Sequence, residues 1–334
     1  MTLSPGPPPW PIPPSWTVTP PRRATATTDT LPPDTGTAPP PVSAPVPASA
    51  PAPVEQGVPR QAIVLLAPDD AAARDVVGAV PGVTVEARTL PAPAVDFAGV
   101  YALADAVARA FAEGAEGVVV VDGGDTPDET AWALDLLHAG DAPLVLAAGP
   151  GGAVDVADAV NVAAAAPAGS GCLAVAHGEV HAARYVRRTG AHELSSPGAG
   201  PLGRVTAGSV RLRWRPPERL TVRDVPTGDR TPRVGLHTAV LGDDGELPAA
   251  LAERCDGLVV AGGAPDPVVR ALATAASRIP VVLASATGHD AFTTTSLDPR
   301  KARVLMHLLL ATGRDRDAVL AAFVAAERPG QARL

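Results

Sequence analysis

The sequence predicts an α/β protein with a parallel-sheet N-terminal domain and a smaller α/β C-terminal domain. Three observations support this fold class. Short apolar, β-branched runs alternate with segments of helical periodicity from about residue 61 onward, which is the pattern of parallel strands covered by helices. The alternation starts again near residue 232, after a stretch rich in Pro and Arg. The 334 residues, 46% of them hydrophobic, suffice for one large domain or two medium ones.

Residues 1–60 differ in composition from the rest of the chain. They contain 19 of the 39 prolines, mixed with Ala, Thr and Ser. Such a segment buries too little apolar surface to offset its ordering entropy, so we expect it to be disordered. PPPWPIPPSW, residues 7–16, would present Trp10 and Trp16 to a partner on a polyproline helix. A solvated tail, or a gene start placed too early, explains the same residues.

The first regular elements are predicted from residue 61 onward. QAIVLLAPDD at 61–70 favours a buried strand, and a weaker strand is expected at 83–90. Apolar residues then recur at helical intervals from Val100 to Gly114, where the glycine favours a C-terminal cap. GVVVV, beginning at Gly117, predicts a strand buried on both faces.

A helix is predicted directly behind this strand. Thr126 is expected to cap it, Pro127 fits its first position, and Glu129 completes a capping box. Gly140 is expected to end the helix, and APLVLAAG, beginning at Ala142, predicts the next strand. This alternation indicates parallel strands with helices on both faces.

The second half of the chain repeats the pattern on a smaller scale. Residues 203–232 are predicted to form a short strand and an interdomain connector. The elements expected after them are strands within 232–242, 256–267 and 280–285, a helix ending near Arg278, and a helical pair from Lys301 to Phe323. The expected domains are a tail (1–60), a large domain (61–205), a connector (206–231) and a small domain (232–330).

Composition argues against several classes of function. A formal net charge of -8 and a pI near 5.4 disfavour nucleic acid as a partner. No uncharged apolar run of about 18 residues predicts a membrane span, and no segment has the pattern of a signal peptide. Cys172 and Cys255 lack metal-ligand spacing, which favours buried thiols in a reducing cytoplasm and no metal. Glycine-rich nucleotide motifs are missing, so no cofactor is expected.

The turn behind the GVVVV strand is the candidate ligand site. In open parallel sheets, ligands bind beyond the carboxyl ends of strands, near the point where strand order reverses. Glycines there let backbone approach a ligand, and the following helix N-terminus favours negative charge. The candidate residues are Asp122, Gly123, Gly124, Asp125 and Thr126. An acidic residue that only caps a helix explains the same pattern.

Three stretches carry a resemblance to the bacterial L-asparaginase/glutaminase family. VVVVDGGDTPDETAWALDLL, residues 118–137, resembles the family's second signature, roughly H-G-T-D-T-x-E-E-T-A. HAARYVRRTGAHELSSPGAGPLGRV, residues 181–205, is similar to the segment that carries a catalytic lysine, followed by S-P-x-x-G-P-L-G. LDPRKARVLMHLLLATG, residues 297–313, resembles the L-x-P-x-K-A-R helix of the small domain. The resemblance runs from about Ile63 to Phe323 and implies an asparaginase-like fold.

The resemblance implies a reaction in which a threonine attacks the side-chain amide of asparagine. The family assists it with a second threonine, a tyrosine on a mobile lid, a lysine paired with an aspartate, and a glutamate from a partner subunit. The first signature, T-G-G-T-I, falls on residues 68–72 and places Ala71 at the nucleophile position. Gly124 replaces the second threonine, Arg188 replaces the lysine, and Asp125 is retained.

Other parts of the family site are also changed. The lid is largely missing, and the two tyrosines, Tyr101 and Tyr185, match other regions. The loop that carries the glutamate is shortened to ATGHDAFTTTS, residues 286–296. Arginine cannot deprotonate, so it cannot serve as a base. Losing several members of one catalytic unit should abolish the reaction, because the members act together.

Two functions follow as hypotheses. The first is a pseudoenzyme that binds a small amino-acid-like ligand or a partner through a remodelled cleft, with Asp125 and Arg188 now paired. The second is an active amidohydrolase with a rearranged site, for which Thr126, Asp122 and Thr189 are candidate replacements. Four histidines are possible bases, but none forms a sequence motif with a serine or threonine: His177, His181, His192 and His289. The resemblance also implies a homo-oligomer, a dimer or tetramer, which leaves a role as a subunit or scaffold open.

Overall fold

The computed structural model describes residues 61–69, 80–91, 94–122, 124–148, 153–190, 193–214, 219–225, 231–285 and 289–327. The predictions made for the tail with Trp10 and Trp16, for Ala71, for Gly123 and for His192 lie outside these residues. The tail, up to Val54, and the rest of the chain form separate units.

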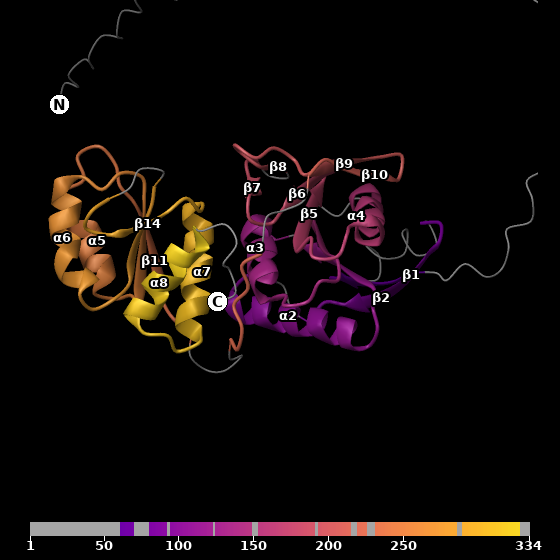
Figure 1. Cartoon of the computed structure of the whole chain (residues 1–334), viewed down its shortest axis with the longest axis horizontal. Coiled ribbons are helices and arrows are strands. Elements are labelled where there is room, and N and C mark those ends of the chain that lie inside the picture. The colour runs from indigo at the N-terminus through magenta and orange to yellow at the C-terminus, as the bar shows by residue number, and fades with distance from the viewer. Residues whose placement is uncertain are drawn as a thin grey trace, which may run out of the picture. The chain divides into compact units, whose positions relative to one another are not determined.

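An eight-stranded sheet organises the large domain (Figure 1). Its parallel part consists of β1 (Gln61–Ala67), β2 (Val83–Thr89), β3 (Gly117–Asp122), β4 (Leu144–Ala148) and β5 (Cys172–Ala176). Three antiparallel strands extend it: β6 (Glu179–Ala182), β9 (Gly203–Thr206) and β10 (Ser209–Leu212). The strand order is β10-β9-β6-β5-β4-β3-β1-β2. The predicted strands at 61–70, 83–90, 117–121 and 142–149 correspond to β1–β4.

Helices cover both faces of this sheet, as predicted. The side chains that point to one face of the sheet, such as those of Ile63 and Val119, pack against α4 (Ala153–Ala165). The side chains that point to the opposite face, such as those of Val64 and Val118, pack against α2 (Phe97–Ala112) and α3 (Pro127–Leu137). Because successive residues of a strand point to opposite faces, an uninterrupted apolar run such as GVVVV fills two cores at once.

The boundaries of α3 differ from the prediction. Thr126 stands at the N-cap, but its side chain makes no capping hydrogen bond, and its ψ of 49° departs from the extended conformation usual there. The capping box with Glu129 is therefore not formed; the carboxylate of Glu129 instead lies 3.9 Å from Arg303. The helix ends at Leu137, three residues before Gly140. Pro127 does occupy the first turn, as expected.

The small domain is built on four parallel strands in the order β11-β12-β13-β14. They are β11 (Val234–Thr238), β12 (Gly257–Ala261), β13 (Val281–Ala284) and β14 (Thr293–Thr295). On one face lie α5 (Glu246–Ala252) and α6 (Asp266–Ala276), and on the other lie α7 (Pro299–Ala311) and α8 (Arg316–Ala326) (Figure 1). The second strand–helix alternation is thus confirmed.

Helix α7 joins the two sheets into one structure. Almost every residue of α7 is buried, because its side chains pack against the small sheet and also against Trp132 and Leu136 of α3. A short hairpin, β7 (Arg187–Arg188) with β8 (Leu194–Ser195), stands apart from both sheets. Strand β10 belongs to the large sheet, so this sheet extends into the segment that the sequence assigned to the connector.

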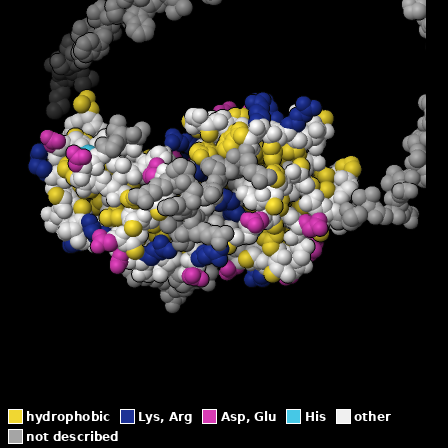
Figure 2. Space-filling view, viewed as in Figure 1, with side chains coloured by type: hydrophobic (Ala, Val, Ile, Leu, Met, Phe, Trp, Pro, Cys, Tyr) yellow, Lys and Arg dark blue, Asp and Glu magenta, His cyan; other side chains and the backbone are white. Residues whose placement is uncertain are grey.

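Two surface properties bear on partners. Basic and acidic side chains are interspersed over the face shown in Figure 2. No helix within the described ranges has both the length and the apolar character that a membrane span requires.

Candidate functional site

The strand order of the large sheet reverses between β1 and β3. The chain passes from β1 to β2 on one side and then returns to place β3 on the other side of β1. Such a switch point opens a crevice beyond the carboxyl ends of the two strands. These ends are Ala67 of β1 and Asp122 of β3, so the predicted turn from Asp122 to Thr126 lies at this point of the sheet.

The described residues of the turn are largely open to solvent. Gly124 and Asp125 are exposed and Thr126 is half-buried. Asp122 ends β3, whereas its side chain and all of Gly123 lie outside the described part of the structure. The turn therefore offers an accessible carboxylate, that of Asp125, directly before the N-terminus of α3.

Asp125 and Arg188 form the pair that the sequence suggested. Nη1 of Arg188 donates to Oδ1 of Asp125 at 3.2 Å and also to its backbone carbonyl. Nε of the same guanidinium donates to the carbonyl of Gly190 at 2.9 Å. The Asp125 side chain is 96% exposed, and an ion pair in such a setting contributes about 1 kcal/mol or less. The pair thus orients two groups without adding much stability.

Asp128 contacts the backbone of Arg188 and so supports this pair. It was not among the candidate residues predicted from the sequence. Its side chain is 2% exposed, and Oδ2 accepts a hydrogen bond from the backbone N–H of Arg188 at 3.2 Å. The other oxygen, Oδ1, is buried and has no hydrogen-bond partner among the described residues. A buried carboxylate in the first turn of a helix is stabilised by the helix dipole, so α3 can hold this charge beneath the hairpin that carries Arg188.

Lys301 is the single lysine of the chain. It belongs to α7 of the small domain, and its side chain contacts the backbone of Asp128 in the large domain. Its Nζ donates to the backbone carbonyls of Asp128, at 3.2 Å, and of Ala183. Burial lowers the pKa of Lys301 to about 8, although carboxylates, Asp128 foremost, act in the other direction. Lys301 could not be assigned to the site from the sequence, because it lies far from Arg188 along the chain. Only its place in the K-A-R helix pointed to it.

One of the four histidines lies beside a serine in space, although no sequence motif links the two residues. Nδ1 of His181 lies 3.0 Å from Oγ of Ser196, and Nε2 lies 3.5 Å from a carboxylate oxygen of Glu179. Both His181 and Ser196 are at most 4% exposed, and burial lowers the pKa of the imidazole. Because both side chains are almost fully buried, this arrangement has a structural role, in which β6 is joined to the segment that follows β8.

Thr189 offers no activated hydroxyl. Its Oγ1 lies 3.5 Å from the carbonyl of Glu193, and its backbone N–H donates to the same oxygen at 2.9 Å. These bonds close the hairpin of β7 and β8. Thr126 differs, because its hydroxyl is not engaged in capping α3. Within the described ranges no group of three or more His, Cys, Asp or Glu side chains is placed to hold a metal ion.

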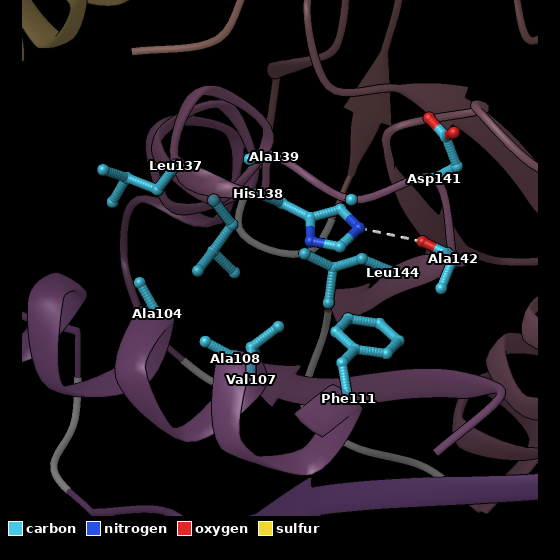
Figure 3. Close-up of a pocket in the computed structure, with 12 residues that line it drawn as sticks. Ala104, Val107, Ala108, Phe111, Leu137, His138, Ala139, Asp141, Ala142 and Leu144 are labelled. Atoms are coloured by element: carbon cyan, nitrogen blue, oxygen red, sulfur yellow. Dashed lines mark hydrogen bonds between the residues drawn. The ribbon is translucent and has the colours of Figure 1, made fainter. Parts of the chain in front are cut away.

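A separate cavity of about 330 Å³ lies between α2 and the C-terminal end of α3 (Figure 3). Its lining is mainly apolar and includes Val107, Phe111 and Leu144. The ring of His138 points into it, stacks on Phe111 at 4.9 Å and donates from Nε2 to the carbonyl of Ala142 at 2.9 Å. Leu144 begins β4, so this cavity lies at the amino edge of the sheet, opposite the turn.

Comparison with known proteins places these features in a family. Residues 60–218 match the N-terminal asparaginase domain. A "Probable L-asparaginase" of Deinococcus radiodurans is 33% identical over 272 residues, which cover 70% of this chain and 83% of that protein. A "Probable L-asparaginase periplasmic" of Haemophilus influenzae is 30% identical over 235 residues, or 60% of this chain and 67% of that protein.

The fold is similar to that of a solved relative. The crystal structure of a probable cytoplasmic L-asparaginase from Campylobacter jejuni matches with a TM-score of 0.68 and 23% identity. The match covers 79% of this chain and 99% of the other. The sequence identity to the Deinococcus protein over most of its length, together with the matched domain, shows that this chain belongs to the asparaginase family.

Proposed function

We propose that this protein is a degenerate asparaginase that binds a small amino-acid-like ligand beyond β1 and β3 and has lost most or all of its hydrolytic activity. The ancestral reaction is hydrolysis of the L-asparagine side-chain amide to aspartate and ammonia, which the names of its relatives support. The substituted site residues of this chain support the loss of this reaction.

The contact between Arg188 and Asp125 carries the proposal. The family resemblance places a lysine at position 188, where a neutral amine can accept a proton from a nucleophile. A guanidinium keeps its charge at any physiological pH and has no lone pair to offer. Here it donates to both the carboxylate and the carbonyl of Asp125. The pair therefore holds the turn in place and cannot activate a hydroxyl.

The nucleophile positions point the same way. Gly124 has no side chain, and Ala71 has no hydroxyl, so neither can form an acyl-enzyme intermediate. What remains is a binding arrangement. The exposed carboxylate of Asp125 suits the ammonium of an amino acid, and the N-terminus of α3 behind it favours the ligand's carboxylate.

We extend the proposal to assembly and location. A homo-oligomer is supported by the family's known assemblies, in which active sites lie between subunits. A cytoplasmic location is supported by the two free cysteines. The division into a large domain at 61–205, a connector at 206–231 and a small domain at 232–330 is retained as part of this proposal, apart from β10.

A second candidate, hydrolysis with a rearranged site, is favoured by one observation. The hydroxyl of Thr126 does not cap α3, so it is not committed to holding the helix. It follows Asp125 directly, and Asp122 ends the strand before it. In this alternative Thr126 is the nucleophile and one of the two carboxylates takes its proton.

Ammonia release from L-asparagine and L-glutamine separates the two candidates. The full chain is assayed beside Asp125→Ala and Thr126→Ala, with folding checked by circular dichroism and L-aspartate binding by calorimetry. We expect turnover far below about 1 per second and binding of L-aspartate that Asp125→Ala removes. Ordinary turnover that Thr126→Ala abolishes would replace the first candidate with the second. A folded chain with neither turnover nor binding would refute both.

A further inference from the structure

The ammonium of Lys301 links the small domain to the two chain segments that carry the candidate site. Lys301 lies in the first turns of α7, yet both carbonyls to which Nζ donates, those of Asp128 and Ala183, belong to the large domain. The side chain is 1% exposed. Its backbone carbonyl accepts a hydrogen bond from the indole Nε1 of Trp132 at 3.0 Å, so α7 and α3 are joined in both directions.

These two carbonyls belong to the chain segments that carry Asp125 and Arg188. Asp128 lies in the first turn of α3, three positions after Asp125. Ala183 lies after β6, on the segment that leads into β7 and Arg188. The two segments also meet through Oδ2 of Asp128 and the backbone N–H of Arg188, at 3.2 Å. One buried cation therefore binds both supports of the Asp125–Arg188 pair.

We propose that Lys301 is a positioning residue for the ligand site, which fixes the carboxylate of Asp125 relative to the guanidinium of Arg188 and thereby sets the affinity for the ligand. The inference rests on the ligand-binding function proposed above and deepens it. Lys301 does not touch the ligand: it acts through Asp128 and through the segment between Ala183 and Arg188.

The charge environment couples Lys301 to the site. Carboxylates face it from two elements: Asp128, Glu129 and Asp135 on α3, and Asp298 at the start of α7. An ammonium has three donors, and two of those of Lys301 have partners among the described residues. Oδ1 of Asp128 is a buried acceptor that has no partner among the described residues. A shift of Asp128 therefore alters both a hydrogen bond and the field at Nζ.

Because Lys301 is the only lysine, its side chain can be observed alone. The full chain, labelled with ¹³Cε-lysine, gives a single side-chain resonance whose pH titration reports the state of this amine. We expect the titration midpoint to move when L-aspartate is added. We also expect Arg188→Met to move it without ligand, because that variant removes the bonds of the guanidinium to Asp125 and Gly190. These bonds hold the hairpin whose backbone N–H at position 188 contacts Asp128. Arg204→Met, which removes an exposed guanidinium from β9, is the matched control and should leave the midpoint unchanged.

Binding supplies the second measurement. Lys301→Met keeps the length of the buried stem and removes the donors, and we expect affinity for L-aspartate to fall about tenfold, a typical coupling between linked sites. A chain that binds no L-aspartate but whose lysine midpoint moves in Arg188→Met would refute the proposed function, while it would support the coupling of Lys301 to the Asp125–Arg188 pair. A midpoint that Arg188→Met moves no further than Arg204→Met would overturn the positioning role, even if ligand binds. The titration decides the matter if Lys301→Met does not fold.

Discussion

Trp132 and Lys301 hold each other across the junction of the two domains. The indole Nε1 donates to the carbonyl of Lys301 at 3.0 Å, while the ammonium lies 5.9 Å from the centroid of the indole ring. Both side chains are at most 1% exposed. A cation above an aromatic face is favourable when water is excluded. The contact therefore offsets part of the cost of burying a lysine and ties α3 to α7.

Replacing Trp132 with phenylalanine should destabilise the protein by about 2 kcal/mol, because the carbonyl of Lys301 loses its donor and the smaller ring leaves a void. Urea unfolding of the full chain measures the change. Trp214→Phe is the control: Trp214 is half-buried and packs edge-on against Tyr185, so its loss should cost less than about 1 kcal/mol. If the two variants lose the same free energy of unfolding, the role given to Trp132 is contradicted.

The titration of Lys301 should make stability rise with pH between about 8 and 10.5. The pKa of Lys301 is about 8 in the fold, against an ordinary value of 10.5. The unfolded chain therefore binds more protons in this window, and the cost of a buried ammonium is fully present below pH 8. The gain across the window is at most about 3 kcal/mol.

Other groups oppose this gain, so the comparison must isolate the lysine. Burial raises the pKa of Tyr101 to about 12 and that of Cys172 well above its ordinary value. The stability that these two groups contribute is lost as pH rises. The unfolding free energy of Lys301→Met is therefore subtracted from that of the unchanged chain at pH 7.5 and at pH 10. A difference that stays constant between the two pH values would contradict a depressed lysine pKa.

Much of the fold could be predicted because the signals are local. Uninterrupted apolar runs such as GVVVV give strands buried on both faces, and helical periodicity gives α2, α7 and α8. The ends of α3 could not be predicted in the same way. Its start depends on the backbone angles of Thr126. Its end is set by Arg219, whose guanidinium arrives from a distant segment to bind the last carbonyls.

The site was predictable only in part, for the same physical reason. The turn and the pairing of Asp125 with Arg188 followed from motif resemblance, which carries three-dimensional information within a few letters. Asp128 looked like an ordinary residue of a first helical turn, and Lys301 belonged to the other domain. Asp128 contacts Arg188, and Lys301 contacts Ala183, only in the folded protein, where α7 packs on α3. No local sequence pattern predicts these contacts.

His307 should make stability fall in mild acid. Its Nδ1 donates to the carbonyl of Pro232 at 3.0 Å, so the neutral ring accepts at Nε2 from the hydroxyl of Tyr101, at 3.1 Å. Burial lowers the pKa of His307 to about 4. The unfolded chain takes up the proton first, so stability present above about pH 6.5 is lost as pH falls toward 4. Between pH 7.5 and 5 the loss is about 2 kcal/mol.

The measurement for His307 is a difference between two proteins. Burial also lowers the pKa of His138 and of His181, and these histidines add to the acid sensitivity with the same sign. His307→Gln keeps the polar character of the position and does not titrate. Its unfolding free energy should therefore fall less than that of the unchanged chain between pH 7.5 and 5. Identical losses would show that His307 is not the group that titrates.

Of the ion pairs described here, the one between Arg219 and Asp135 should cause the largest loss of unfolding free energy when it is broken. Nε of Arg219 lies 3.1 Å from Oδ1 of Asp135, and its other nitrogens donate to the carbonyls of Asp135, His138 and Gly140. Asp135 also accepts from the backbone N–H of Cys172 at 2.8 Å. The pair fits only because residue 171 is a glycine: a Cβ there would stand 2.3 Å from Oδ1 of Asp135.

Arg219→Met should cost about 3–5 kcal/mol, because it leaves the carboxylate of Asp135 buried without its cation and frees the last carbonyls of α3. Arg213→Met, at an exposed position, is the control and should cost less than about 0.5 kcal/mol. Adding Asp135→Asn to Arg219→Met removes the stranded charge and should recover at least about 1 kcal/mol. If the double variant is less stable than Arg219→Met alone, the cost comes from the freed carbonyls of α3 and not from the buried carboxylate.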